Sequence, residues 1–411
     1  MDTDTCTAYT PEVAALMPPA AGAAGAAGAA LAKRPWWRRL LPVLGGFAGG
    51  GVVGAGIAAV GLPLLETMPP SAGLAALAGF FLSLWPHIVV HEAGHAVAGL
   101  SRGMHAIAFG VGPLRWERGG DGHWRWRNGG GIRGVGGFAA LLPRGTRGLS
   151  RVDQIVFLLG GPLANLLSAA LLAALVAWLP MPAWLTGALA GMALGAATLG
   201  LGNLLPLRLQ GWRSDGRGLL DLLRRTPDAA LQLQVNQLMA LSLAGMRPRD
   251  WPENAMPTAD ASIASSGLLQ TAQMLRLARA VDCGDAGAAR PEALALTAGF
   301  AAAAPVFQSA IAVALASHAA LLVRNRRLLS AWRLRCEGGL MDLSPYRAWL
   351  DAEIAGLDGD DAAIALHIAR ARGLTGRIPD AASRLVFEER LAALAKCRVG
   401  SAGVHAEPVL G

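Results

Sequence analysis

Four long apolar runs set the limits on how this chain can fold. They cover roughly residues 40–65, 72–100, 152–179 and 184–209. Each exceeds the roughly 20 residues that a helix needs to cross a bilayer. Since 53% of the 411 residues are hydrophobic and only 16% are charged, the chain is not an ordinary soluble protein. We therefore predict an all-α polytopic membrane protein with about four transmembrane helices.

The arginines and lysines indicate how these helices are oriented. Basic clusters precede the first run, separate the second from the third and follow the fourth, whereas residues 66–71 and 180–183 contain no Lys or Arg. Because positively charged loops stay on the cytoplasmic side, we predict that both termini and residues 101–150 are cytoplasmic. The expected location is the cell (inner) membrane. The net charge of +8 comes from these clusters, so it predicts no nucleic-acid partner.

Composition divides the chain into three parts. Residues 1–39 are expected to be a flexible tail, 40–225 a membrane-embedded domain, and 226–411 a cytoplasmic helical domain with a binding or regulatory role, for example towards a cytoplasmic regulator. Within the last part, the apolar run 293–323 is split by Pro305, so we predict a buried helix pair and not a fifth span. The four cysteines are scattered, which favours reduced thiols over a disulfide framework.

A strand-like pattern interrupts the apolar runs between residues 101 and 150. Apolar side chains alternate with small or charged ones in two segments: Ile107, Phe109 and Val111 in the first, Trp124 and Trp126 in the second. A Gly-Gly-Asp-Gly turn at residues 119–122 separates the two segments. Alternation on both sides of such a turn predicts a small β-hairpin insertion.

The second apolar run carries the motif His91-Glu92-Ala93-Gly94-His95. Two histidines four residues apart project from one face of a helix and can bind the same Zn²⁺ ion. Glu92 can then act as general base towards a water whose pKa the metal lowers to about 7. Ionisable side chains are costly in an apolar helix and persist mainly where they have a function. Pro86 should bend this helix just before the motif.

The third and fourth runs carry buried amides. Gly160-Gly161-Pro162 is predicted to interrupt the third helix, shortly before Asn165. The fourth run ends with Asn203 and is followed by Ser214-Asp215-Gly216. Either asparagine could hydrogen-bond an extended substrate or its oxyanion, or could merely cap a broken helix.

In this order the motifs resemble the site-2 protease family of intramembrane zinc metalloproteases. The resemblance rests on His-Glu-Ala-Gly-His, Gly-Gly-Pro-Leu-Ala-Asn and the Asn-Leu-Leu-Pro segment followed by Asp-Gly, and it covers roughly residues 72–225. It implies that His91, His95 and Asp215 bind zinc, that Glu92 is the catalytic base, and that the hairpin is the family's membrane-associated β element. Asn203 and Asp215 are twelve residues apart, which is longer than is usual in that family.

Geometry and elimination also favour Asp215 as the third ligand. His87 continues the histidine series, but it lies about 12 Å from His95 along a helix, whereas each ligand nitrogen must be about 2.1 Å from the metal. The acids between the hairpin and Glu253 are Asp153, Asp215, Asp221, Asp228 and Asp250. Of these, only Asp215 follows a broken span end with Asn and Pro. We therefore expect the chain after Asn203 to loop back to the metal.

The predicted activity is that of a zinc metalloendopeptidase acting on membrane-spanning or membrane-proximal protein segments near the cytoplasmic face. A substrate helix would unwind, and the free hairpin edge could bind it by strand addition. One alternative is a non-proteolytic metal-binding scaffold or transport component, which would not need Glu92. Another is a membrane protease for prenylated C-termini, which would need a glutamate ligand on a later apolar helix. Residues 118–252 contain no glutamate, which counts against it.

Overall fold

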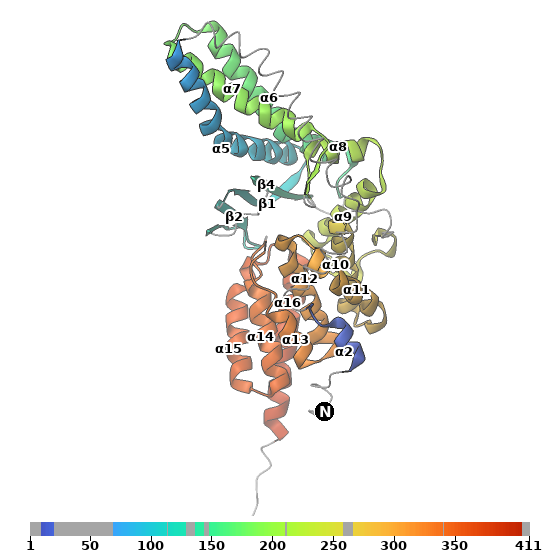
Figure 1. The fold of residues 1–411 in the computed structure, drawn as a ribbon. Helices are drawn as coiled ribbons and strands as arrows, with labels where there is room; N and C mark the ends of the chain where they lie inside the picture. The colour runs from blue at the N-terminus through green and yellow to red at the C-terminus, as the bar shows by residue number, and fades with distance from the viewer. Residues whose placement is uncertain are drawn as a thin grey trace, which may run out of the picture.

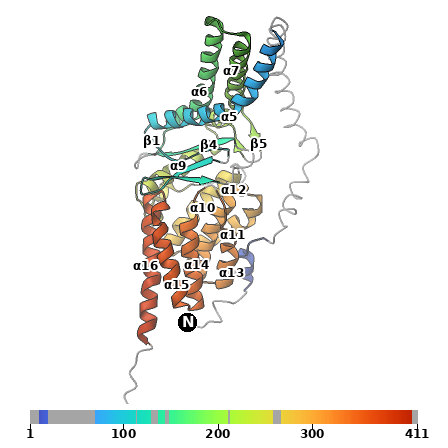
Figure 2. The same cartoon turned by 90° about the vertical axis from the view of Figure 1, so that its left-hand side faces the viewer.

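The structure is a computed structural model with three layers. Its described residues are 10–19, 69–112, 114–128, 136–143, 148–209, 212–257, 266–339 and 341–404. A small β-sheet lies between an apolar helical bundle and a larger helical domain (Figures 1 and 2). The first predicted span, residues 40–65, lies outside the described residues.

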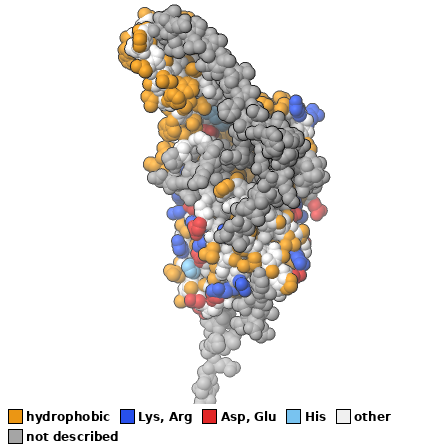
Figure 3. Space-filling view, in the orientation of Figure 1, with side chains coloured by type: hydrophobic (Ala, Val, Ile, Leu, Met, Phe, Trp, Pro, Cys, Tyr) orange, Lys and Arg blue, Asp and Glu red, His pale blue; other side chains and the backbone are white. Residues whose placement is uncertain are grey.

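Three helices form the bundle: α5 (Pro70–Ser101), α6 (Arg151–Trp178) and α7 (Ala183–Leu204). Among the described residues, these three are long and apolar enough to cross a membrane. They correspond to the second, third and fourth predicted spans, although the fourth ends at Leu204 and not at residue 209. Apolar side chains cover the bundle surface, whereas charged ones gather on the helical domain (Figure 3). The three apolar helices indicate a membrane protein.

Prolines affect α5 and α6 differently. Helix α5 is continuous through Pro86 but changes direction partway along its length (Figures 1 and 2), as expected for an internal proline. Helix α6 runs without a break through Pro162, so the predicted interruption at residues 160–162 is wrong. Proline removes only one backbone hydrogen-bond donor. Within a bundle, neighbouring helices and local adjustments compensate for the missing hydrogen bond, so the helix can continue.

Glycines bring α5 and α7 into backbone contact. Gly187 faces Ala72, and Gly191 faces Ala76 one turn further along. A Cβ atom at either glycine would overlap the backbone oxygen of the facing alanine. Small residues at four-residue spacing are typical of helix packing in lipid, where close approach replaces the hydrophobic effect.

The sheet contains four antiparallel strands in the order β3-β2-β1-β4. They are β1 (Met104–Val111), β2 (Leu114–Arg118), β3 (Trp124–Asn128) and β4 (Gly137–Pro143). The hairpin prediction is correct for strand structure but incomplete: the turn at 119–122 joins β2 to β3, not β1 to β3. A further turn at Gly112, with φ of +58°, joins β1 to β2. Glycine favours this left-handed conformation.

The helical domain follows the bundle. Its helices are α8 (Asp215–Leu223), α9 (Pro227–Leu243), α10 (Ser266–Cys283), α11 (Ala286–Gly299), α12 (Pro305–His318), α13 (Arg326–Arg333), α14 (Ser344–Asp358), α15 (Asp361–Leu374) and α16 (Ala381–Val404). Trp332, Trp349 and Phe387 are fully buried in its core. The run 293–323 supplies buried residues of α11 and α12, which confirms the predicted buried pair.

Part of the N-terminal tail packs onto this domain. Helix α2 (Pro11–Leu16) buries Val13 and Leu16 in the helical core, and the indole of Trp332 donates a hydrogen bond of 2.8 Å to the Leu16 oxygen. Thr10 caps the helix. The expectation of a flexible tail is therefore wrong for this segment, because two apolar side chains share one helical face.

The sheet connects the other two layers. One side of it contacts α5 through β1 and β4. On the helical domain, Arg115 donates a hydrogen bond of 3.0 Å to the Gly339 oxygen, and Glu117 accepts one of 3.0 Å from the Asp342 amide. Arg115 and Glu117 are both buried. The helical domain is thus joined to the sheet by charge-assisted hydrogen bonds.

Candidate metal centre

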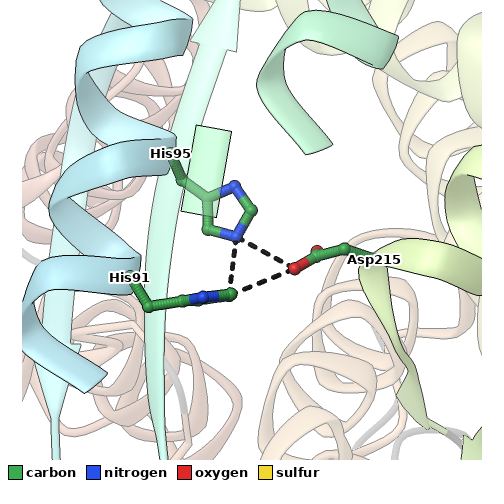
Figure 4. A group of neighbouring side chains, drawn as sticks. All are labelled: His91, His95 and Asp215. Carbon is green, nitrogen blue, oxygen red and sulfur yellow. Dashed lines mark hydrogen bonds and ion pairs between the residues drawn. The ribbon is translucent and has the colours of Figure 1, made fainter. Parts of the chain in front are cut away.

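Two adjacent turns of α5 and the start of α8 bring three metal-ligating side chains together at the base of the bundle (Figure 4). His91 Nε2 lies 3.1 Å from Asp215 Oδ2, and His95 Nε2 lies 3.2 Å from the same oxygen. The two Nε2 atoms are 3.2 Å apart. Both histidines are buried, as the apolar surroundings of the motif predict.

A short hairpin returns the chain from α7 to the histidines. Strands β5 (Arg208–Leu209) and β6 (Trp212–Arg213) pair antiparallel, and Ser214 then caps α8 by accepting a hydrogen bond from the Arg217 amide. This hairpin lies within the eleven residues between Asn203 and Asp215, in agreement with the predicted return loop. The long spacing therefore still delivers Asp215 to the site.

Asp215 is placed to remain ionised. Burial works to raise the pKa of its carboxyl group, but hydrogen bonds to His91 and His95 outweigh burial and hold the pKa below its ordinary value. Asp215 is also the first residue of α8, where the helix dipole favours a negative charge. An ionised carboxylate is the form that binds a metal.

The arrangement fits a tetrahedral metal ion with one open position. Bonds of about 2.0–2.1 Å in a tetrahedron place ligand atoms about 3.3 Å apart, and the separations observed are 3.1–3.2 Å. Two imidazoles and a carboxylate leave the fourth position for water or substrate, as in catalytic sites. The group could therefore hold a metal ion.

The other nitrogen of each histidine also has a partner. His95 Nδ1 lies 2.7 Å from the Phe157 carbonyl oxygen, and donation to that oxygen leaves Nε2 free to bind a metal. His91 Nδ1 lies 3.3 Å from the Asn165 amide nitrogen, while Asn165 Oδ1 is buried without a partner. Exchanging the oxygen and nitrogen of this amide lets Oδ1 accept from His91 Nδ1 and satisfies both groups.

This placement bears on the predicted role of Asn165. The residue is 0% exposed and packs behind the imidazole of His91. Its location therefore indicates that Asn165 positions His91 and does not contact a substrate. Nearby, a Cβ atom at Gly161 would overlap His95 Nε2, so only glycine fits beside the two ligand nitrogens.

Asn203 lies on the open side of the site. Its amide nitrogen is 2.7 Å from His91 Nε2 and 2.6 Å from Asp215 Oδ2, and the side chain is partly exposed. Asn203 thus borders the position that a reacting group would occupy. It is the better placed of the two asparagines for contact with a substrate or an oxyanion.

Glu92 points to the same space from the next position on α5. It is buried, and its carboxylate accepts a hydrogen bond from the Ala139 amide of β4. A cavity of about 550 Å³ opens beside it, lined by the motif, β4, Asn203 and Asp215. Sequence reasoning did not identify the contact with Ala139. The one sequence feature that points to this contact is the pair of glycines before Phe138, because a Cβ atom at Gly137 would crowd Glu92.

His87 belongs to a different network. Its Nδ1 lies 2.9 Å from the Ser83 oxygen and its Nε2 lies 3.1 Å from the Ser168 hydroxyl of α6. It is therefore engaged between α5 and α6, in agreement with its exclusion as a ligand.

Comparisons of the chain with protein-family models, with curated proteins and with solved structures found no match in any of the three.

Proposed function

We propose that this protein is an intramembrane zinc metalloprotease that resembles the site-2 proteases and hydrolyses membrane-spanning or membrane-proximal protein segments near the cytoplasmic face. The observation that carries the proposal is the meeting of His91, His95 and Asp215 beside Glu92 at the base of three apolar helices. A site with a general base and a cavity next to the metal ligands suits hydrolysis better than metal storage.

The residues of the site have distinct roles in this proposal. Zinc supplies Lewis-acid chemistry, polarising a carbonyl group and acidifying water. Glu92 accepts a proton from the attacking water and returns it to the leaving amine. The hydrogen bond from the Ala139 amide holds the Glu92 carboxylate in position for this proton transfer. Asn203 is close enough to the ligand atoms to donate a hydrogen bond to a developing oxyanion.

Strand β4 supports a way of holding the substrate. It is the outermost strand on its side of the sheet, and the Ala139 amide faces Glu92. A substrate helix hides its peptide bonds in its own hydrogen bonds, so it must unwind before cleavage. An unwound segment could add to β4 as a further strand, which would place its backbone along the cavity.

We propose the orientation that the arginines indicate: both termini and the sheet on the cytoplasmic side of a cell (inner) membrane. The substrate is then a membrane protein or peptide within the lipid bilayer. The helical domain joins the sheet through Arg115 and Glu117, so a cytoplasmic regulator that binds this domain could act on the sheet beside the metal site.

The Glu92→Gln variant tests the activity. With purified protein and single-span model peptides, we expect it to lower the cleavage rate by about 100-fold or more, because only the proton acceptor is lost. A chelator should stop cleavage by the parent, and zinc content should match between parent and variant. Equal cleavage by both would rule out this mechanism. A parent that binds zinc but cleaves no peptide would favour the non-proteolytic scaffold.

The ligand set is tested separately by Asp215→Ala. We expect zinc stoichiometry to fall, because the site keeps only two of its three ligands. His87→Ala is the matched control and should keep its zinc, since His87 contacts Ser83 and Ser168 instead of the site. Metal loss on His87→Ala, together with retention on Asp215→Ala, would reverse the assignment.

A further inference from the structure

A second cavity lies inside the helical domain, among α10, α12, α14 and α16. Its volume is about 150 Å³. Most of its wall is apolar, with Leu277 and Val281 on α10 and Phe387 on α16 all buried. An apolar cavity of roughly 150 Å³ can hold a molecule the size of benzene. The space is therefore large enough for a small ligand.

Most polar side chains on the wall are already engaged. Asp282 accepts hydrogen bonds from Arg247 of 2.7 and 3.1 Å, and another of 3.0 Å from a backbone amide. The Ser317 hydroxyl donates to the Val313 oxygen at 2.8 Å. The Tyr346 hydroxyl is hydrogen-bonded to Ser383. None of these groups requires a ligand.

Arg390 is the exception on the wall. Its guanidinium stacks over the ring of Trp349, with 4.9 Å between the guanidinium carbon and the ring centroid. Among the described residues, no carboxylate lies within salt-bridge distance of it. Arg247 shows the contrast, because it pairs with both Asp282 and Glu389 at 2.7 Å. Burial lowers the pKa of the Arg390 guanidinium, whereas the two carboxylates raise that of Arg247.

We propose that this cavity binds a small monocarboxylic acid, whose carboxylate pairs with Arg390 and whose short apolar stem fills the rest of the space. A guanidinium matches a carboxylate through two parallel hydrogen bonds. Tyr346 also lines the cavity, with its hydroxyl hydrogen-bonded to Ser383, so Arg390 is the group left to pair with the carboxylate. The site is separate from the metal centre and does not depend on the proposed protease activity.

Benzoate is the probe for this site. Titration of the full-length purified protein, followed by calorimetry, should show saturable one-to-one binding with a Kd of about 1 mM or tighter. Acetate, which lacks the stem, and benzyl alcohol, which lacks the charge, should each bind roughly tenfold more weakly or worse. Equal binding of benzyl alcohol, or no saturable binding of benzoate, would overturn the proposal.

Two variants locate the binding. Arg390→Met should weaken benzoate binding roughly tenfold or more, whereas Arg370→Met, on the exposed face of α15, should leave it unchanged. Ala314→Leu fills the cavity and should abolish binding while Arg390 is retained, so it gives a second test if Arg390→Met does not fold. Thermal unfolding without ligand confirms that each variant is folded. Unchanged benzoate affinity in Ala314→Leu would place the ligand elsewhere and overturn the proposal.

Discussion

The bundle and the helical domain pack their helices in opposite ways. In the bundle, Gly187 and Gly191 bring backbones together, while large side chains such as Phe81 and Trp178 face outward with 61% and 82% of their surface exposed. In the helical domain, large side chains such as Trp332 fill the core. Packing apolar side chains between helices gains no hydrophobic free energy in lipid, whereas it does in water. Close backbone contact therefore suits the bundle, and burial of large side chains suits the helical domain.

The difference also explains where the polar groups lie. Three of the four buried ionisable side chains of α5 converge on the candidate metal centre, and the fourth, His87, is hydrogen-bonded between α5 and α6, because a charged or strongly polar group in lipid must be paired or functional. The helical domain spreads its buried charges over several ion pairs, such as Arg247 with Asp282. Within the described helices, most of the buried polar groups of the bundle are therefore concentrated around the candidate metal centre.

Removing a large core side chain should produce the largest effect. Trp332→Ala should destabilise the helical domain by about 3–5 kcal/mol, because it leaves a cavity and removes the hydrogen bond to Leu16. Phe81→Ala, on the outer surface of the bundle, should change stability by less than about 0.5 kcal/mol. Denaturant unfolding in detergent measures both. Equal effects would contradict the comparison of the two regions.

Adding one methyl group in the bundle should produce the next largest effect. Gly191→Ala forces a Cβ atom against the Ala76 backbone and should cost about 1–3 kcal/mol. Gly202→Ala on the same helix is the control, because a Cβ atom there meets nothing within 4 Å. Both changes replace a helical glycine of α7 by alanine, so the difference in unfolding temperature reports mainly on the contact with Ala76. A control as unstable as Gly191→Ala would show that the α5–α7 contact is not the cause.

A partly buried carboxyl group in the helical domain should give the smallest effect. Burial raises the pKa of Glu353 from 4.5 to about 7, against the hydrogen bond of 2.8 Å from Trp349. The folded state therefore holds a proton that the unfolded state has lost. Its stabilising contribution is complete below about pH 4.5 and is lost as the pH rises through about 7. The difference between these pKa values corresponds to about 3 kcal/mol for a fully buried group, and solvent around the partly exposed Glu353 reduces it to on the order of 1 kcal/mol.

Glu353→Gln tests this contribution, because it keeps an acceptor for Trp349 but does not titrate. The stability of the variant should be flatter than that of the parent between pH 4.5 and 7. Unfolding followed at several pH values measures it. Parallel pH profiles for the parent and Glu353→Gln would assign the pH dependence to another group.

The sequence predicted the features that depend on short-range patterns. Apolar length predicted the three bundle helices, and the spacing of His91 and His95 predicted that they share a helical face. The hydrogen bond between Glu92 and Ala139 could not be predicted from the sequence. It depends on how β4 pairs with β1, and residues 112–136 separate these two strands, so no local pattern sets their register. Likewise, nothing local in residues 1–39 indicated that Val13 would pack into a domain more than 250 residues away.

The bend of α5 fixes how far the candidate site lies from the Pro70 end of the bundle. Pro70 to Pro86 is 17 residues, which is about 25 Å of helix at 1.5 Å per residue. Beyond the bend, the half of α5 with the histidines runs steeply across the direction of α6 and α7 (Figures 1 and 2). If the protein cleaves a helix lying beside the bundle, as proposed above, the cut should fall about 17 residues from the end of that helix that lies beside Pro70. The position of Pro86 would then select substrates by the length of their apolar segment.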